Sequence, residues 1–305
     1  MSPAQSWTGT EQGRPRPWWT QHSDAELVAL ATEYPYPTPD GSYIFVRGQA
    51  FELVDWTEDP LRDGRARTSG GEINSVGKLL ATLGISRTSP LNERTPVLAY
   101  GSNAAPLQLA RKFRHISQAV IPVLRADVDD IDVVYSAHIS RYGAIPATLT
   151  ASSGTTLHTF VTWLSDAELA VMHASELGQP RPVPVPGNPV PGNYVFGELQ
   201  GVAISSDVVL DDRPVYAYLS RFGALGLRER PLALAAVTAT RRAFTPLAKM
   251  DVLESVRDLL APAQDVETFI LSAIRGDAAR QEWSRLLREA AHPVSLDGFI
   301  EQPNS

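Results

Sequence analysis

Short apolar segments recur through the middle of the chain, and they constrain the fold more than any other feature of the sequence. β-branched and aromatic residues, which favour strands, are concentrated in residues 131–136, 144–150, 157–164, 194–204 and 214–219. One capping box, Ser165-Asp166-Ala167-Glu168, interrupts the series and predicts a helix from Asp166 to about Ser175. Several short strands with one intervening helix predict a closed or nearly closed barrel.

The region before this series, residues 23–94, carries both helix and hairpin signals. Ser23-Asp24-Ala25-Glu26 is a second capping box and predicts a helix. Arg47-Gly48 separates two apolar segments and predicts a β-hairpin. A third box, from Ser69 to Glu72, predicts a helix over residues 73–83.

The last region, residues 223–305, has the pattern of a helical segment. Thr245 followed by Pro246 predicts a helix start, and apolar residues at helical spacing continue from there to Leu260. A further helical pattern ends at Gly276, and a third helix is expected after it.

Together these patterns predict an α+β protein. Residues 95–222 are expected to form a small mixed β-barrel with flanking helices. An N-terminal α+β accessory region, residues 23–94, and a C-terminal helical region, residues 223–305, surround it. Residues 1–22 are polar and rich in Pro and Trp, and we expect them to form a disordered or extended arm.

The composition excludes several classes of protein. None of the 305 residues is cysteine, which excludes disulfides, thiolate catalysis and zinc sites with Cys ligands. The 27 basic and 34 acidic residues give a net charge of −7, which argues against a broad nucleic-acid-binding surface. No apolar run reaches about 18 residues, and the N-terminus lacks the apolar core of a signal peptide. We therefore expect a cytoplasmic protein with neither a membrane nor a nucleic acid as partner.

The familiar catalytic signatures are absent from the sequence. It contains no Gly-x-Ser-x-Gly elbow, Gly-x-x-x-x-Gly-Lys-Ser/Thr loop, Gly-x-Gly-x-x-Gly fingerprint or His-Glu-x-x-His pair. The six histidines show no metal-ligand spacing, so we expect them on the surface or in the core. Four aspartates form an acidic cluster: Asp127, Asp129, Asp130 and Asp132. Such a cluster could hold a hard cation, although a solvated turn that leads into a strand is the favoured interpretation. No metal and no cofactor is expected.

One loop is a candidate binding element. Tyr100-Gly101-Ser102-Asn103 lies where an apolar strand ends and a helix is expected to begin. Gly101 would let the backbone approach a ligand closely, and the unpaired amides of a helix start can bind a carboxylate or a developing oxyanion. A plain strand-to-helix turn explains the same residues equally well.

Glu176 is a candidate acid–base residue. It lies where the helix that begins at Asp166 is expected to end, and we expect it beside the apolar strand that ends in Trp163-Leu164. A carboxylate among apolar groups is protonated more readily, so it can act first as a base and then as an acid near neutral pH. An ordinary surface glutamate at a helix end is the alternative.

The order of these motifs resembles the gamma-glutamylcyclotransferase-like family. The Tyr100–Asn103 loop follows an apolar strand, as in that family, and Ala147-Thr148-Leu149 is similar to the family's next conserved strand. The segment Val161–Leu169 resembles the entry into its helix, Glu176 falls at the position of its catalytic glutamate, and Tyr194 begins the strand that follows. The resemblance covers about residues 95–222.

The resemblance implies a mechanism as well as a fold. It implies that Glu176 is the general acid and base, and that the amides of Gly101, Ser102 and Asn103 hold a carboxylate or oxyanion. Tyr100 and Tyr194 would position the substrate through their hydroxyls. The substrate would be a small γ-glutamyl or related acyl amide, cleaved without a cofactor.

Two departures from the family pattern leave the substrate open. Ala104 stands where the family has a bulkier apolar residue, and the Pro-rich segment 180–192 is long for its position. The first alternative function is a hydrolase or decarboxylase of the same fold that acts on another nitrogenous substrate. The second is a non-catalytic binding or interaction protein. The oligomeric state is left open.

Overall fold

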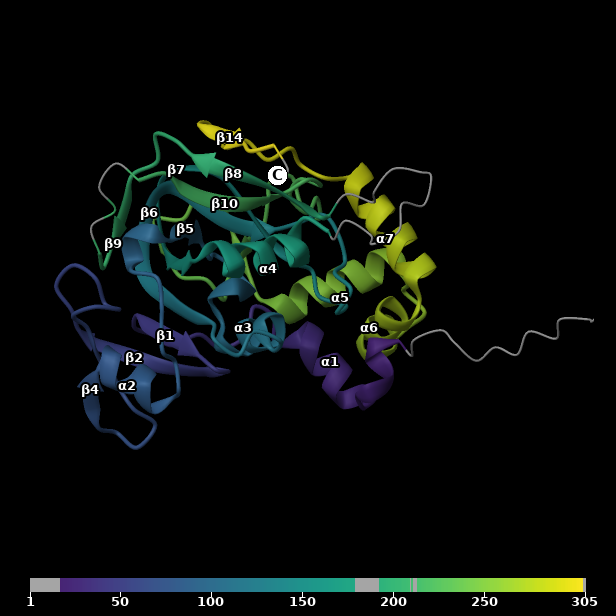
Figure 1. The fold of residues 1–305 in the computed structure, drawn as a ribbon. Coiled ribbons are helices and arrows are strands. Elements are labelled where there is room, and N and C mark those ends of the chain that lie inside the picture. The colour runs from purple at the N-terminus through teal and green to yellow at the C-terminus, as the bar shows by residue number, and fades with distance from the viewer. Residues whose placement is uncertain (1–16, 179–191, 209, 211–212, 304–305) are drawn as a thin grey trace, which may run out of the picture.

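The computed structural model describes residues 17–178, 192–208, 210 and 213–303 (Figure 1). Within them a fourteen-stranded, mostly antiparallel sheet has the order β14-β8-β10-β5-β7-β6-β1-β2-β3-β4 along its main path, with β9, β11, β12 and β13 attached at its sides. The strands are β1 Tyr43–Val46, β2 Gln49–Asp55, β3 Arg65–Arg67, β4 Ile73–Ser75, β5 Thr95–Leu98, β6 Val120–Tyr135, β7 Ala147–Leu164, β8 Tyr194–Leu199, β9 Ile204–Ser206, β10 Val215–Ser220, β11 Ala233–Leu234, β12 Ala239–Thr240, β13 Pro246–Leu247 and β14 Phe299–Glu301.

Helices flank this sheet, and two of them begin at caps that the sequence predicts. The α-helices are α1 Asp24–Thr32, α2 Val76–Thr82, α3 Pro106–Phe113, α4 Asp166–Glu176, α5 Lys249–Leu260, α6 Val266–Arg275 and α7 Asp277–Glu289, and the short 3-10 helices are η1 Trp18–Gln21, η2 Leu91–Glu93 and η3 Ser102–Ala104. Complete capping boxes start α1, at Ser23, and α4, at Ser165. The α+β class is therefore confirmed.

The longest strands differ from the prediction. The segments expected as three short strands between residues 131 and 164 belong to β6 and β7, which form one long antiparallel hairpin. The register shifts between Asp129 and Ile131, where Asp130 has a φ of 60° and the strand can bend at this bulge. Because β6 continues to the N-terminal side of this bulge and pairs there with β1 and β9, the structure contains a large sheet. The described strands show no small closed barrel.

Two predicted helix starts are wrong. The Ser69–Glu72 box leads into β4, which pairs with β3, and Ser75 caps α2 instead. Thr245-Pro246 leads into β13, which pairs with β11, so α5 begins only at Lys249. In both places pairing with a neighbouring strand places in the sheet residues that local capping signals assign to a helix.

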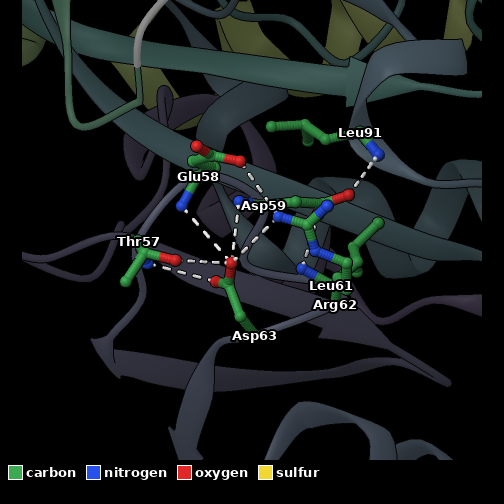
Figure 2. A network of polar contacts seen from close by, with 7 residues as sticks. All are labelled: Thr57, Glu58, Asp59, Leu61, Arg62, Asp63 and Leu91. Atoms are coloured by element: carbon green, nitrogen blue, oxygen red, sulfur yellow. Dashed lines mark hydrogen bonds and ion pairs between the residues drawn. The ribbon is translucent and has the colours of Figure 1, made fainter.

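The N-terminal region is part of the central sheet, since β1 pairs with β6. The loop after β2 is closed by Asp63, whose carboxylate accepts a hydrogen bond from the Thr57 hydroxyl at 2.6 Å (Figure 2). Burial opposes ionisation here, but hydrogen bonds from the Thr57 side chain and from neighbouring amides outweigh it and lower the pKa of Asp63 to about 2. Asp59 accepts a hydrogen bond from the Leu91 amide at 2.9 Å and so ties this loop to the segment before β5.

Part of the predicted N-terminal arm has regular structure. Residues 1–16 lie outside the described residues, but Trp18–Gln21 form η1. The Trp18 ring packs edge-on against Tyr142, with ring centroids 5.2 Å apart. Two large aromatic rings bury enough apolar surface to hold a short segment in place. Residues 18–21 therefore form a helical turn where a disordered or extended arm was expected.

The larger of two hydrophobic clusters contains residues of all three predicted regions, from Leu27 in α1 to Leu287 in α7. At its edge a buried ion pair fixes the start of α4: Arg94 Nη1 lies 2.8 Å from Glu168 Oε2. The other oxygen of Glu168 accepts a hydrogen bond from the Val120 amide at 2.8 Å. The first turn of α4 is thus anchored to Arg94, just before β5, and to the start of β6, which determines where the far end of the helix lies.

Among the described residues, no helix combines the length and apolar character needed to cross a membrane. The predicted stiff loop at 180–192 lies outside the described residues except for Gly192.

Candidate functional site

The six site residues predicted from the sequence line one cavity. The cavity has a volume of about 940 Å³, which is within the range of small-ligand pockets. The loop that follows β5, the last residue of α4 and the first residue of β8 contribute the predicted residues: Tyr100, Gly101, Ser102, Asn103, Glu176 and Tyr194. Helices α3 and α4 lie side by side at the cavity (Figure 1).

The loop needs glycine at position 101. A Cβ atom there would lie 2.9 Å from the Tyr34 hydroxyl oxygen and 3.7 Å from the Ala147 Cβ atom, and real Cβ atoms do not approach that closely without displacing a neighbour. The Tyr34 hydroxyl in turn accepts a hydrogen bond from the Ala147 amide at 2.9 Å. Gly101 therefore lets the loop pack against both Tyr34 and β7.

The loop backbone has donors to offer. The hydrogen bonds among the described residues leave the amides of Ser102 and Asn103 without an acceptor. Behind the loop, the buried Tyr43 of β1 donates a hydrogen bond to the Ala104 carbonyl at 2.6 Å. The N-terminal region thus braces the loop from its buried side, a role that no sequence motif indicated.

Glu176 contacts the loop through Asn103, whose Nδ2 donates to Glu176 Oε1 at 3.1 Å. Lys112, on α3, forms an ion pair with the same oxygen and also donates from Nζ to Asn103 Oδ1 at 2.7 Å. The three side chains form a closed triangle in which each contacts the other two. Among the described residues no donor reaches Glu176 Oε2.

The surroundings of Glu176 differ from the prediction. Trp163-Leu164 lead into the first turn of α4, whereas Glu176 ends that eleven-residue helix, about 15 Å away at 1.5 Å per residue. Its side chain, 16% exposed, lies against a cation and an amide rather than beside that apolar strand. Lys112, 7% exposed, was missed by the sequence analysis. The one sequence feature that could have indicated Lys112 is its position in the last turn of the helix that follows the loop.

Several tyrosines surround the carboxylate. Burial, reinforced by the negative charge of Glu176, raises the pKa of Tyr34, Tyr100, Tyr194 and Tyr218, so each hydroxyl stays neutral. The Tyr194 hydroxyl donates to the Ala147 carbonyl at 3.1 Å, and the Tyr100 hydroxyl donates to the Tyr218 carbonyl. Because both protons are used, these two hydroxyls can only accept a further hydrogen bond.

A buried histidine forms part of the cavity wall. His138 is 1% exposed, and its Nδ1 lies 2.9 Å from Ser136 Oγ. Burial, with a smaller effect of the Arg288 charge, lowers the pKa of His138 to about 3. Its Nε2 has no hydrogen-bond partner among the described residues. His138 is therefore a neutral ring, in agreement with the expectation of a core histidine.

The acidic cluster of β6 is divided among separate partners. Asp127 lies 2.7 Å from His158, Asp129 accepts from Thr156 at 2.7 Å, and Asp130 accepts from the Gly154 amide at 2.6 Å. Asp132 pairs with Arg242 at 3.0 Å. These four residues lie along a strand and its bulge rather than in the solvated turn that was favoured.

No protein-family model, curated protein or solved structure matches this chain significantly.

Proposed function

We propose that this protein is a gamma-glutamylcyclotransferase-like enzyme that cleaves a γ-glutamyl amide or a related small acyl amide. One observation carries the proposal: Glu176, at the end of α4, is hydrogen-bonded to Asn103 of the Tyr100–Asn103 loop at a cavity large enough for a small ligand. A carboxylate and free backbone amides at the same cavity supply the two kinds of group that this reaction needs.

The reaction needs a base, an acid and an oxyanion site. The α-ammonium of the γ-glutamyl group transfers a proton to Glu176, and the free amine attacks the γ-carbonyl carbon of the same molecule. Glu176 returns this proton to the leaving nitrogen, whose bond to the γ-carbon then breaks. The ring nitrogen gives up its second proton, which passes through Glu176 to the expelled amine, so the products are 5-oxoproline and an ammonium ion. One carboxylate can perform both transfers, and the amides of Ser102 and Asn103 would stabilise the oxyanion.

The tyrosines fit the binding of an ammonium group. Since the protons of Tyr100 and Tyr194 are donated to backbone carbonyls, their oxygens are acceptors, as a substrate N–H group requires. Binding in this way would hold the amine near its own carbonyl carbon, which lowers the entropic barrier to ring closure.

Lys112 and Asn103 have a positioning role in this proposal. Both contact Glu176 Oε1, so Oε2 is the oxygen left to exchange a proton with the substrate. The ammonium of Lys112 also offsets the charge that Glu176 brings into the cavity wall.

The family assignment and the location are part of the same proposal. Residues 95–222 would contain the core of the gamma-glutamylcyclotransferase-like fold, enlarged here by strands from both flanking regions, and the enzyme would act in the cytoplasm.

Product analysis tests the proposal and its alternatives together. The full chain is incubated with a panel of γ-glutamyl amides, and 5-oxoproline, glutamate and the released amine are quantified. The proposal predicts 5-oxoproline and amine in equal amounts. Glutamate in place of 5-oxoproline would indicate a hydrolase, and binding of the amides without any turnover would indicate a binding protein.

A further inference from the structure

The cavity wall is strongly basic although the chain is acidic. The net charge of the protein is −7, yet four cationic side chains and one carboxylate line the cavity: Arg111, Lys112, Arg114, Arg141 and Glu176. The Lys112–Glu176 ion pair cancels two of these charges, which leaves three guanidinium groups.

These three guanidinium groups form no ion pair with any described residue. Arg111 lies over the Tyr36 ring, with its central carbon 4.8 Å from the ring centroid, and its Nη1 is buried without a hydrogen-bond partner among the described residues. Arg114 donates from Nε to His115 Nε2 at 2.8 Å, and its two terminal nitrogens have no partner in the described part of the chain. A buried guanidinium N–H group without an acceptor, as at Arg111, is costly, and an anionic ligand would satisfy it. Arg114 is exposed, and its terminal N–H groups are open to the same ligand.

Arg141 comes from a different part of the chain and is held by aromatic rings. Its central carbon lies 4.7 Å from the Tyr142 centroid and 5.7 Å from that of Trp18. Its Nη2 donates to the Tyr142 hydroxyl at 2.7 Å. Stacking of this kind restricts a guanidinium group while leaving its other N–H donors available.

The segment that carries Arg141 is fixed by the C-terminal region. The Ile139 amide donates to Ser284 Oγ on α7 at 3.1 Å. Gly143 has a φ of 78°, and a Cβ atom there would lie 3.1 Å from Ile270 on α6.

Cations near the end of α3 are favoured by its helix dipole, which gives Arg111 and Arg114 a structural explanation. That explanation does not extend to Arg141, since this residue lies in a turn.

We propose that Arg111, Arg114 and Arg141 form a subsite for a multiply charged oxyanion, either a phosphate monoester or paired carboxylates. A singly charged carboxylate would balance only one of the three guanidinium groups, whereas these groups suit bidentate binding of a doubly charged oxyanion. The inference rests on the proposed function, because it assigns this group to the amine half of the amide substrate, next to the Glu176 end of the cavity.

Binding of simple anions tests the subsite without any need for turnover. Inorganic phosphate, tricarballylate and acetate are titrated into the full chain by calorimetry at low and moderate salt. The subsite predicts that phosphate or tricarballylate binds at least about tenfold more tightly than acetate. A preference for phosphate would indicate a phosphate monoester as the natural group, and a preference for tricarballylate would indicate paired carboxylates. Equal, weak binding of all three anions would overturn the proposal.

Two variants locate the binding. Arg141→Ala, which removes an exposed side chain, is expected to weaken binding of the preferred anion about tenfold, as is the conservative Arg111→Lys. Arg87→Ala, in an exposed loop remote from the cavity lining, is the matched control and should bind like the wild type. Unchanged affinity in Arg141→Ala and Arg111→Lys would contradict the assignment.

A comparison of substrates separates this inference from the proposed function. The γ-glutamyl amides of phosphoethanolamine, aspartate and ethanolamine differ in the charge of their amine half. The inference predicts a higher kcat/KM for one of the charged amides, and that Arg141→Ala removes the preference. Turnover without any charge preference would refute the subsite alone, whereas arginine-dependent anion binding without turnover of any amide would refute the proposed function alone.

Discussion

The ammonium of Lys112 forms an ion pair with Oε1 of Glu176, and the side chain of Asn103 bridges the two residues. The proposed acid–base carboxylate is therefore held between two helices and a loop, with one oxygen fixed and the other free of donors from the described part of the chain. This arrangement connects the sequence motif around Asn103 with a residue on α3 that belongs to no motif.

Removal of the lysine tests how far that pair stabilises the protein. We expect Lys112→Met to lower the free energy of unfolding by about 1.5–3 kcal/mol, because it leaves a partly buried carboxylate with one fewer charged hydrogen bond. Urea denaturation measures the change. Lys78→Met, at an exposed position on α2, is the control and should change stability by less than about 0.5 kcal/mol. Equal stability of the two variants would show that the ion pair contributes nothing measurable.

Substitution of Gly101 tests the close packing of the loop. Gly101→Ala places a methyl group 2.9 Å from the Tyr34 hydroxyl, so we expect a loss of about 1–3 kcal/mol from overpacking together with lower turnover of the substrate. Gly77→Ala on α2, where a Cβ atom meets no neighbour within 4 Å, should instead add about 0.5–1 kcal/mol. The account of the loop is wrong if Gly101→Ala is as stable and active as the wild type.

Glu168 tests the anchoring of α4. Glu168→Gln leaves the buried Arg94 without its counter-charge, and we expect a loss of about 3–5 kcal/mol. Thermal and urea unfolding both report this change. A loss below about 1 kcal/mol would mean that the ion pair does not anchor the start of α4, and that the position of Glu176 at its other end has another cause.

His138 predicts a specific pH dependence of stability. The folded protein holds this ring neutral with a pKa of about 3, whereas the ordinary value is 6.5. Between these two values the unfolded chain binds a proton that the folded chain does not, so the free energy of unfolding falls as the pH falls from 6.5 towards 3. His138→Asn should reduce this slope, and His22→Gln, at an exposed histidine, should preserve it. An unchanged slope in His138→Asn would contradict the assignment.

The sequence indicated most of the local structure around the cavity. The capping boxes at Ser23 and Ser165 mark α1 and α4 correctly, because a cap depends on residues within one turn. The box at Ser69 failed since Ile73 pairs with Arg67 in a hairpin, and pairing of this kind depends on the neighbouring strand rather than on the local capping signal. The full length of β6 could not be predicted either, because its charged residues do not look like a strand and its pairing depends on β7.

The cavity could be predicted only in part. The loop and Glu176 carry a motif, and the structure brings them into contact through Asn103. Tyr34, Lys112 and Arg141 carry none, because their roles depend on packing between segments that are distant in the sequence. The sequence assigned no function to the two flanking regions. In the structure the N-terminal region supplies Tyr34 and Tyr43, and the C-terminal region supports the segment that carries Arg141.

Glu176→Gln is the sharpest test of Glu176 as the acid and base, because it removes the proton-transfer group while leaving a side chain of the same size. We compare 5-oxoproline release from the best γ-glutamyl amide by the wild type, by this variant and by Glu254→Gln, a control at an exposed position on α5. We expect Glu176→Gln to lose turnover by at least about 10²-fold while its melting temperature stays within a few degrees, and the control to be fully active. Full activity in a folded Glu176→Gln protein would contradict the account.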